Sequence, residues 1–199
     1  MIRVMSIIII IGLSINGFTS ANPSRFTENG LKIGDKAPNF YANTDEGELW
    51  KLPDHIGKKF LVIYFYPAAM TSGCTKQACS YRDNKDNLSK LDVEVVGVSG
   101  DPVKNLQIFK KEHRLNFTLL SDVNGDIARL FGVPTRQGGT VTRNVDSREV
   151  SLTRSVTEAR WTFVVDKSGK IVYINTEVDP EKDSKQIMEF IAGISKKAK

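Results

Sequence analysis

The stretch FLVIYFYPAAMTSGCTKQAC (60–79) decides the fold and holds both cysteines of the chain, Cys74 and Cys79. Its first part, residues 60–66, is an unbroken apolar and aromatic run, which is typical of a central strand covered on both faces. Residues 74–91 place a few apolar side chains among many polar ones, and this pattern predicts a helix. The two cysteines therefore follow a strand and a short loop and lie on the helix that comes next.

The position of Cys74 at the start of this helix predicts a reactive thiol. Thr71 or Ser72 can act as the helix cap. A sulfur in the first turn faces unpaired backbone N–H groups and the positive end of the helix dipole. Both favour the thiolate over the thiol, and the thiolate is the nucleophile.

The spacing of the two cysteines restricts what they can form together. On a regular helix their Cα atoms would be about 8.7 Å apart, from a rise of about 1.5 Å per residue and a Cα radius of about 2.3 Å. A disulfide tolerates at most about 7 Å, so Cys74 and Cys79 can bond only if the helix unwinds. This disfavours a static disulfide staple, although two cysteines in an exported protein are more often structural. It favours a switch between a helical reduced form and an unwound bridged form.

A metal site at the cysteines is poorly supported by the sequence. The histidines are His55 and His113, and neither has ligand spacing to Cys74 or Cys79. We therefore expect no metal.

The rest of the chain alternates between strand and helix patterns. We expect strands over 93–98 and 117–120, hairpins over 39–52 and 161–175, and helices over 102–113, 126–132 and 180–199. Strands that alternate with helices, followed by a hairpin and a last helix, predict an α/β fold with a layered sheet.

One segment does not fit this alternation. Residues 135–159 are long and polar and carry four arginines. Connections of this length are often functional or mobile. We interpret the segment as a long polar insertion loop, a solvated excursion with room for a small hairpin, and keep a binding loop as the alternative.

Composition and charge bound the function. The chain has 199 residues, 40% of them hydrophobic, and a net charge of +5. Residues 22–199 are long enough for one domain with a real hydrophobic core. The charge is modest and spread along the chain, whereas a nucleic-acid binder would usually cluster Lys and Arg on one element. We expect no nucleic-acid partner.

The N-terminal residues, 1–21, have the layout of a cleavable export signal: a basic start at Arg3, an isoleucine-rich run and then small residues. Thr19 and Ala21 would occupy the −3 and −1 positions of the cleavage site. The apolar run is shorter than the about 20 residues that span a bilayer, although an uncleaved anchor is the alternative. We expect an exported protein, periplasmic or extracellular, with no membrane association after cleavage.

The stretch FYPAAMTSGCTKQACSYRD (65–83) resembles the peroxiredoxin pattern P-x-x-x-T-x-x-C, through Pro67, Thr71 and Cys74. It is similar to the peroxiredoxin Q, or bacterioferritin comigratory protein, branch, which has a resolving cysteine five residues after the peroxidatic one, as Cys79 stands here. The resemblance extends along most of the mature chain. The further matching segments are KIGDKAPNF (32–40), VEVVGVSGD (93–101), LLSD (119–122) and RWTFVVD (160–166).

This resemblance implies a thioredoxin-like fold with a central mixed β-sheet flanked by helices. It also implies reduction of hydrogen peroxide and organic hydroperoxides without a metal or organic cofactor, by a monomer or weak dimer. Cys74 would become a sulfenic acid, Cys79 would condense with it to a disulfide, and a thioredoxin-like dithiol protein would reduce the bridge.

The resemblance also implies a set of substrate-binding residues. Arg160 falls where the family has its active-site arginine and would stabilise the charge that develops on the peroxide; Arg154 is the competing candidate. Thr71 would hydrogen-bond the peroxide, Gly73 would allow its close approach, and Pro67 would shape the loop and shield the sulfur.

Three other functions compete with a peroxidase. A thioredoxin-type thiol–disulfide oxidoreductase would have C-x-x-C after the strand, but four residues separate Cys74 from Cys79. An exported copper carrier would have C-x-x-x-C and a suitably placed histidine. A non-enzymatic binding module would use residues 135–159 as its contact surface and would not need Cys74.

Overall fold

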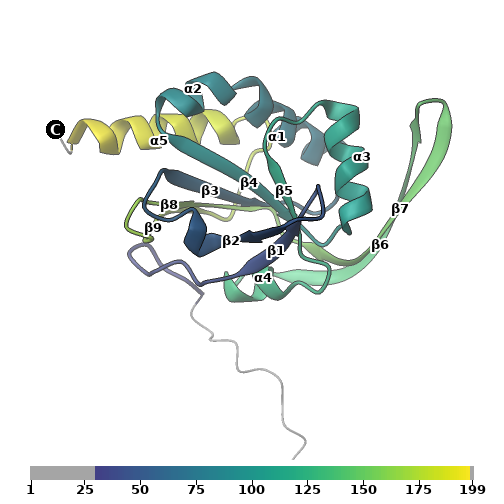
Figure 1. Cartoon of the computed structure of the whole chain (residues 1–199), viewed down its shortest axis with the longest axis horizontal. Helices are drawn as coiled ribbons and strands as arrows, with labels where there is room; N and C mark the ends of the chain where they lie inside the picture. The colour runs from purple at the N-terminus through teal and green to yellow at the C-terminus, as the bar shows by residue number, and fades with distance from the viewer. Residues whose placement is uncertain (1–29, 198–199) are drawn as a thin grey trace, which may run out of the picture.

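A central sheet of seven strands organises the part of the chain that the computed structural model describes, residues 30–197. Its strands are β1 (Tyr41–Thr44), β2 (Leu49–Lys51), β3 (Phe60–Phe65), β4 (Val93–Ser99), β5 (Thr118–Ser121), β8 (Trp161–Val165) and β9 (Ile171–Asn175). They lie in the order β2-β1-β5-β4-β3-β8-β9 (Figure 1). The strands β3, β4 and β5 are parallel and the other pairs are antiparallel, so the expected mixed sheet is confirmed.

The strand β3 lies in the interior of this sheet, between β4 and β8, and both of its faces are covered. Successive side chains of a strand point to opposite faces. Val62 and Tyr64 accordingly pack into one hydrophobic core, and Leu61, Ile63 and Phe65 pack into another. This double burial explains why residues 60–66 are apolar without alternation.

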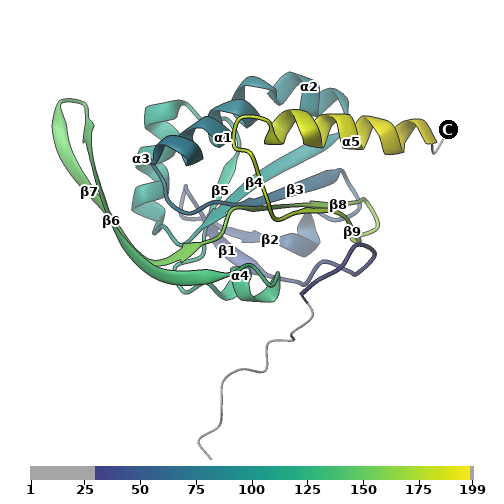
Figure 2. The ribbon, with the colours of Figure 1, turned by 180° about the vertical axis from the view of Figure 1, so that it is seen from behind.

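Helices cover both faces of the sheet (Figures 1 and 2). The core that contains Val62 also takes side chains from α1 (Ser72–Asp83), α2 (Lys85–Lys90), α3 (Val103–His113) and α5 (Asp183–Lys197). The opposite core takes them from α4 (Asp126–Leu130) and the 3₁₀ turn Leu52–Asp54.

The helix expected over 74–91 is two helices. Asn84 interrupts it with non-helical dihedrals, φ −95° and ψ 10°. The Asn84 side chain donates to the Ser80 carbonyl and to the hydroxyl of Ser184, at 2.9 and 3.2 Å. Asn favours such local bonds over a helix interior, and this explains the break.

The segment 135–159 differs most from its expectation as a long polar loop. It forms an antiparallel hairpin along almost its whole length, with β6 (Thr135–Val145) paired to β7 (Arg148–Glu158). The two turn residues, Asp146 and Ser147, both have positive φ, 49° and 62°, as the tight turns that fit strand twist require.

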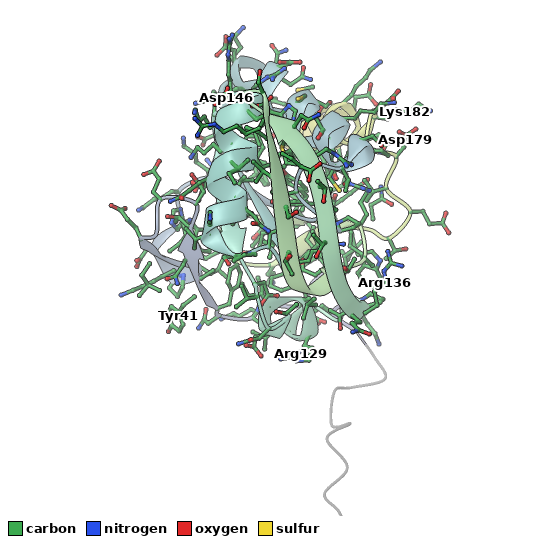
Figure 3. The ribbon with its side chains drawn as sticks, turned by 90° about the vertical axis from the view of Figure 1, so that its right-hand side faces the viewer. Tyr41, Arg129, Arg136, Asp146, Asp179 and Lys182 are labelled. Atoms are coloured by element: carbon green, nitrogen blue, oxygen red, sulfur yellow. The ribbon has the colours of Figure 1, made fainter. Side chains whose placement is uncertain are left out.

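Apolar and polar side chains alternate along the hairpin, and this explains why the segment forms paired strands. Val141 pairs with Leu152, and Val145 and Val150 lie on the same face. Leu152 is buried in the core that contains Val62, and the two valines pack against that core. The opposite face carries polar pairs such as Thr140 with Thr153. In Figure 3 the hairpin rises from Arg136 to Asp146, with α3 on one side and Asp179 and Lys182, at the approach to α5, on the other.

The expected export signal, residues 1–21, lies outside the described residues. Within residues 30–197, no helix combines the length and apolar character that a membrane crossing needs.

Candidate active site

Cys74 lies in the first turn of α1 and is almost fully buried, with 1% of its surface exposed. Thr71 occupies the cap position, but its side chain does not cap the helix. Its hydroxyl donates to the Ala68 carbonyl instead, at 2.8 Å. The proton of that hydroxyl is thereby committed, and its lone pairs are left to accept a hydrogen bond from a ligand.

Arg160 supplies a cation at the sulfur. Its Nη2 lies 3.3 Å from Cys74 Sγ, although the two residues are 86 positions apart in sequence. Arg160 stands in the short connection between β7 and β8, and the pairing of β8 with β3 brings that connection beside the start of α1. The competing Arg154 is engaged elsewhere: it donates to the Thr157 hydroxyl and to the Gly139 carbonyl.

Gly73 keeps the space between the helix and this arginine open. A Cβ at position 73 would lie 3.3 Å from Arg160 Nη2, closer than ordinary contacts. Pro67, which follows β3 closely, is half-buried and lines a pocket together with Pro134 and Ala159 at the base of the hairpin.

The loop between β3 and α1 is held from two directions. The buried carboxylate of Asp101 accepts a hydrogen bond from the Ala69 amide at 2.7 Å. From the hairpin, Arg143 Nε donates to the Met70 carbonyl at 2.9 Å. Met70 has φ +63°, a conformation that non-glycine residues adopt at a cost and that surrounding contacts must maintain. The loop is therefore fixed in an uncommon conformation directly before Cys74.

Cys79 lies on the same intact helix and forms no disulfide with Cys74. Burial raises the pKa of the Cys79 thiol, with a smaller opposing effect from Arg82. In this helical form Cys79 is therefore held as the neutral thiol. By regular helix geometry, the Cα atoms of Cys74 and Cys79 are about 8.7 Å apart.

The arrangement can stabilise negative charge at one place. Cys74 offers a sulfur in the first turn of α1, and Arg160 offers a guanidinium in contact with it. Thr71, at the cap position of the same helix, offers a hydroxyl with free lone pairs. Such a site stabilises the negative charge that develops when a polar bond breaks beside it.

Comparison with known proteins agrees with this geometry. A family model described as the AhpC/TSA family matches residues 33–174, most of the chain. The chain belongs to the AhpC/TSA family. It is similar to "Putative peroxiredoxin bcp" of Coxiella burnetii, with 41% identity over 151 residues that cover 75% of this chain and 92% of the relative.

Two further similarities point the same way. "Peroxiredoxin Q, chloroplastic" of Oryza sativa subsp. japonica is 36% identical over 162 residues, 81% of this chain and 67% of the relative. The crystal structure of peroxidoxin BcpB from Mycobacterium tuberculosis superposes with a TM-score of 0.68 and 30% identity, and covers 82% of this chain and 98% of that one. The resemblance to the peroxiredoxin Q branch is confirmed, and with it the thioredoxin-like fold and a thiol-dependent peroxidase activity.

Two residues of this peroxiredoxin site were not predicted from the sequence, Gln77 and Asp183. Arg160 Nη1 donates to Gln77 Oε1 at 2.5 Å, and Gln77 Nε2 donates to Asp183 Oδ2 at 2.7 Å. Gln77 is three positions after Cys74, so helical periodicity places it on the same face. No local pattern indicates Asp183, which is 106 positions from its partner.

Proposed function

We propose that Cys74 attacks the peroxide and that Cys79 resolves the product to an intramolecular disulfide. The observation that carries the first role is the 3.3 Å contact between Arg160 Nη2 and Cys74 Sγ at the start of a helix. Among residues 30–197, no cation donates a hydrogen bond to Cys79, and burial raises the pKa of its thiol despite the smaller opposing effect of Arg82. Of the two sulfurs, only Cys74 has the surroundings of an activated nucleophile.

In the first step the Cys74 thiolate attacks the terminal oxygen of a hydroperoxide. An S–O bond forms, the O–O bond breaks, and its electron pair leaves with the other oxygen as hydroxide or alkoxide, which then takes a proton. Cys74 becomes a sulfenic acid. Negative charge spreads over both oxygens as the bond breaks, and Arg160 together with the first-turn amides near Gly73 stabilises it. The Thr71 hydroxyl accepts a hydrogen bond from the peroxide, and Pro67 shields the sulfur from water.

In the second step the first turns of α1 unwind and the Cys79 sulfur displaces the hydroxyl of the Cys74 sulfenic acid. An S–S bond forms and one water leaves. Unwinding is required because about 8.7 Å between the two Cα atoms exceeds the about 7 Å that a disulfide allows. A dithiol protein of the thioredoxin type then reduces the bridge by thiol–disulfide exchange and is itself oxidised.

We also propose the substrates, the oligomeric state and the location of the protein. We expect hydrogen peroxide and organic hydroperoxides as substrates, since the chemistry acts on the O–O bond. We expect an exported monomer or weak dimer, periplasmic or extracellular, that binds neither nucleic acid nor, after signal cleavage, a membrane. N-terminal sequencing of the exported protein should then start at Asn22.

The test is peroxide consumption under two reductants, thioredoxin and a small dithiol. We expect Cys74→Ser to be inactive with both. Cys79→Ser should lose most activity with thioredoxin but form the sulfenic acid at the normal rate. Peroxide consumption by Cys74→Ser at the wild-type rate would remove Cys74 from the chemistry and favour a different reactive group.

A further inference from the structure

Asp183 is a buried carboxylate that the chemistry described so far does not use. It begins α5 and has no exposed surface. Its Oδ2 accepts hydrogen bonds from Gln77 Nε2 at 2.7 Å, from the Tyr81 hydroxyl at 2.7 Å and from the Thr162 hydroxyl at 2.9 Å. Two of these donors are on the helix that carries both cysteines, and the third is on the strand that follows Arg160.

The charge state of Asp183 determines which way round the Gln77 amide lies. A carboxylate only accepts hydrogen bonds, so Gln77 must turn its NH₂ group toward Asp183. Its carbonyl oxygen is then turned toward Arg160, which donates to it at 2.5 Å. With the opposite orientation, Gln77 would present N–H groups to the guanidinium, and both partners would be donors.

The orientation of Gln77 in turn fixes Arg160. One guanidinium nitrogen, Nη1, is held by Gln77, and the other, Nη2, is thereby directed at the Cys74 sulfur. A planar guanidinium bonded at one end retains little freedom at the other. We propose that Asp183 is a positioning residue for peroxide reduction, which holds Arg160 against Cys74 by setting the orientation of the Gln77 amide.

The hydrogen bonds of Asp183 support its ionised form. Burial raises the pKa of Asp183 above its usual value, and the hydrogen bonds from Tyr81, Gln77 and Thr162 and the charge of Arg160 limit that rise. Three donors meet at one of its oxygens, as expected of a carboxylate. The other oxygen, Oδ1, is buried and has no hydrogen-bond partner among the described residues.

The same carboxylate also favours the helical form of α1. Gln77 and Tyr81 stand on either side of Cys79, and both donate to Asp183 only while the helix is intact. Unwinding that moves these two side chains would leave Asp183 with the Thr162 hydroxyl alone. Asp183 therefore favours return of the helix, and with it of the Arg160 contact, after the disulfide has been reduced.

The test is Asp183→Asn, an isosteric change that removes the charge and lets the residue at 183 donate as well as accept. We measure two rates by stopped-flow fluorescence: reaction of the reduced protein with hydrogen peroxide, and reduction of the disulfide by excess dithiol. We expect the first to fall by about 10-fold or more, because a preorganised charge is released, and the second to change little. General destabilisation would affect both rates.

Three variants serve as controls. Asp179→Asn makes the same chemical change at a half-exposed position just before α5, and we expect wild-type rates. Thr162→Val removes a donor to Asp183 but leaves Gln77 and Arg160 bonded, so its rate with peroxide should stay within about 3-fold of wild type. Gln77→Leu should reproduce the loss of Asp183→Asn, and the double variant should lose no more than either single one.

The inference rests on the roles proposed for Cys74 and Arg160, so Arg160→Leu is measured in the same series. A wild-type rate with peroxide for Arg160→Leu would overturn the role of Arg160 itself. A large loss there, with a folded Asp183→Asn at the wild-type rate, would overturn only the positioning role of Asp183. Losses that multiply in the Asp183→Asn, Gln77→Leu double variant would also overturn it. Should Asp183→Asn fail to fold, a wild-type rate with peroxide for Gln77→Leu would be sufficient to reject the positioning role of Asp183.

Discussion

The guanidinium of Arg160 has two partners at the active site, the Cys74 sulfur and the Gln77 carbonyl oxygen. Both contacts use the planar fork of an arginine, in which two nitrogens point in fixed, different directions. A lysine would carry the same charge at a single nitrogen. Replacing Arg160 by lysine or by leucine therefore separates the effect of its positive charge from the effect of its two-pronged geometry.

We expect Arg160→Lys to react with hydrogen peroxide about 10-fold more slowly than wild type, and Arg160→Leu about 100-fold or more, as for loss of a preorganised group at a developing charge. The measurement is the second-order rate constant of the reduced protein, followed by intrinsic fluorescence. A wild-type rate for Arg160→Lys would show that charge suffices without the fork.

Glu158 precedes Arg160 by two residues and gives a second prediction. Burial raises its pKa well above the usual range for a glutamate, and Asp122 and then Asp101 add to the rise. The folded chain therefore favours the protonated form of Glu158 more than the unfolded chain does, in which this carboxyl titrates near pH 4.3. The contribution of Glu158 to the free energy of unfolding is therefore complete below pH 4.3. It is lost as the pH rises through the pKa of Glu158 in the folded protein.

Glu158→Gln, which imitates the protonated form, should therefore melt higher than wild type at pH 7.5, by about 2–4 °C for each kcal/mol recovered. The gain should shrink toward pH 4. Thermal melts at both pH values test this, with the exposed Glu149→Gln on the same strand as control. A gain that is independent of pH would contradict the sign argued here.

Sequence could indicate some of these residues but not others. Cys74 and Thr71 are visible because a strand, a loop and a helix start are local patterns. Arg160 was indicated by the family resemblance, and the strand that follows it favoured it over Arg154. Asp183 and Arg143 act through contacts with residues far away in sequence, 106 positions for Gln77 and 73 for Met70. Nothing near them in sequence marks them, since only the assembled fold creates their contacts.

At the scale of elements, the β6–β7 hairpin and the helix α1 meet at the active-site loop. Arg143 binds the Met70 carbonyl, and Asn105 of α3 donates both to Asp101 and to the Thr153 carbonyl of the hairpin. The hairpin thus holds the loop that leads directly into the first turn of α1, and we expect this contact to oppose unwinding of that turn. The polar sequence of 135–159 suggested a loop, because its apolar positions are few and only strand pairing aligns them on one face.

Arg143→Ala should speed the step from sulfenic acid to disulfide by about 3–10-fold, the range expected for loss of one hydrogen bond to the loop. At high peroxide, a smaller share of Cys74 should then reach the sulfinic acid, because resolution competes with further oxidation. Mass spectrometry of the oxidised forms measures this share. Arg148→Ala, at the far end of the hairpin, is the control, and an equal effect there would exclude a specific brace on Met70.

At the scale of the whole molecule, the disulfide and the fold oppose each other. A bridge closing residues 74–79 constrains the unfolded chain by about 2 kcal/mol. Unwinding α1 gives up the hydrogen bonds of Gln77 and Tyr81 to the Asp183 carboxylate, at about 1.5–3 kcal/mol each. The losses exceed the gain, so the reduced molecule should be the more stable one.

The peroxide-oxidised protein should accordingly melt below the reduced protein, by roughly 3–10 °C for a chain of this size. Calorimetry of the two forms measures the difference, with Cys79→Ser as a control that cannot form the bridge. A higher melting temperature for the oxidised form would mean that the bridge stabilises the fold by more than the unwinding of α1 costs.

The overall architecture was the most predictable level. The order of strands and helices and the interior position of β3 follow from hydrophobic runs and turn residues, which are local. The mixed sheet was implied by the family resemblance. The division of 74–91 into two helices was not predicted, because it depends on Asn84 reaching Ser184 of the distant helix α5.

The measurement that tests the central claim most directly is the fate of the two thiols after one equivalent of hydrogen peroxide. Pre-reduced protein is mixed with peroxide, free thiols are counted, and disulfides are mapped by mass spectrometry, with Cys79→Ser alongside. The account predicts rapid loss of both thiols to a Cys74–Cys79 bridge, and a trapped sulfenic acid at Cys74 in the variant. Slow reaction of Cys74, or a sulfenic acid at Cys79 in place of Cys74, would contradict it.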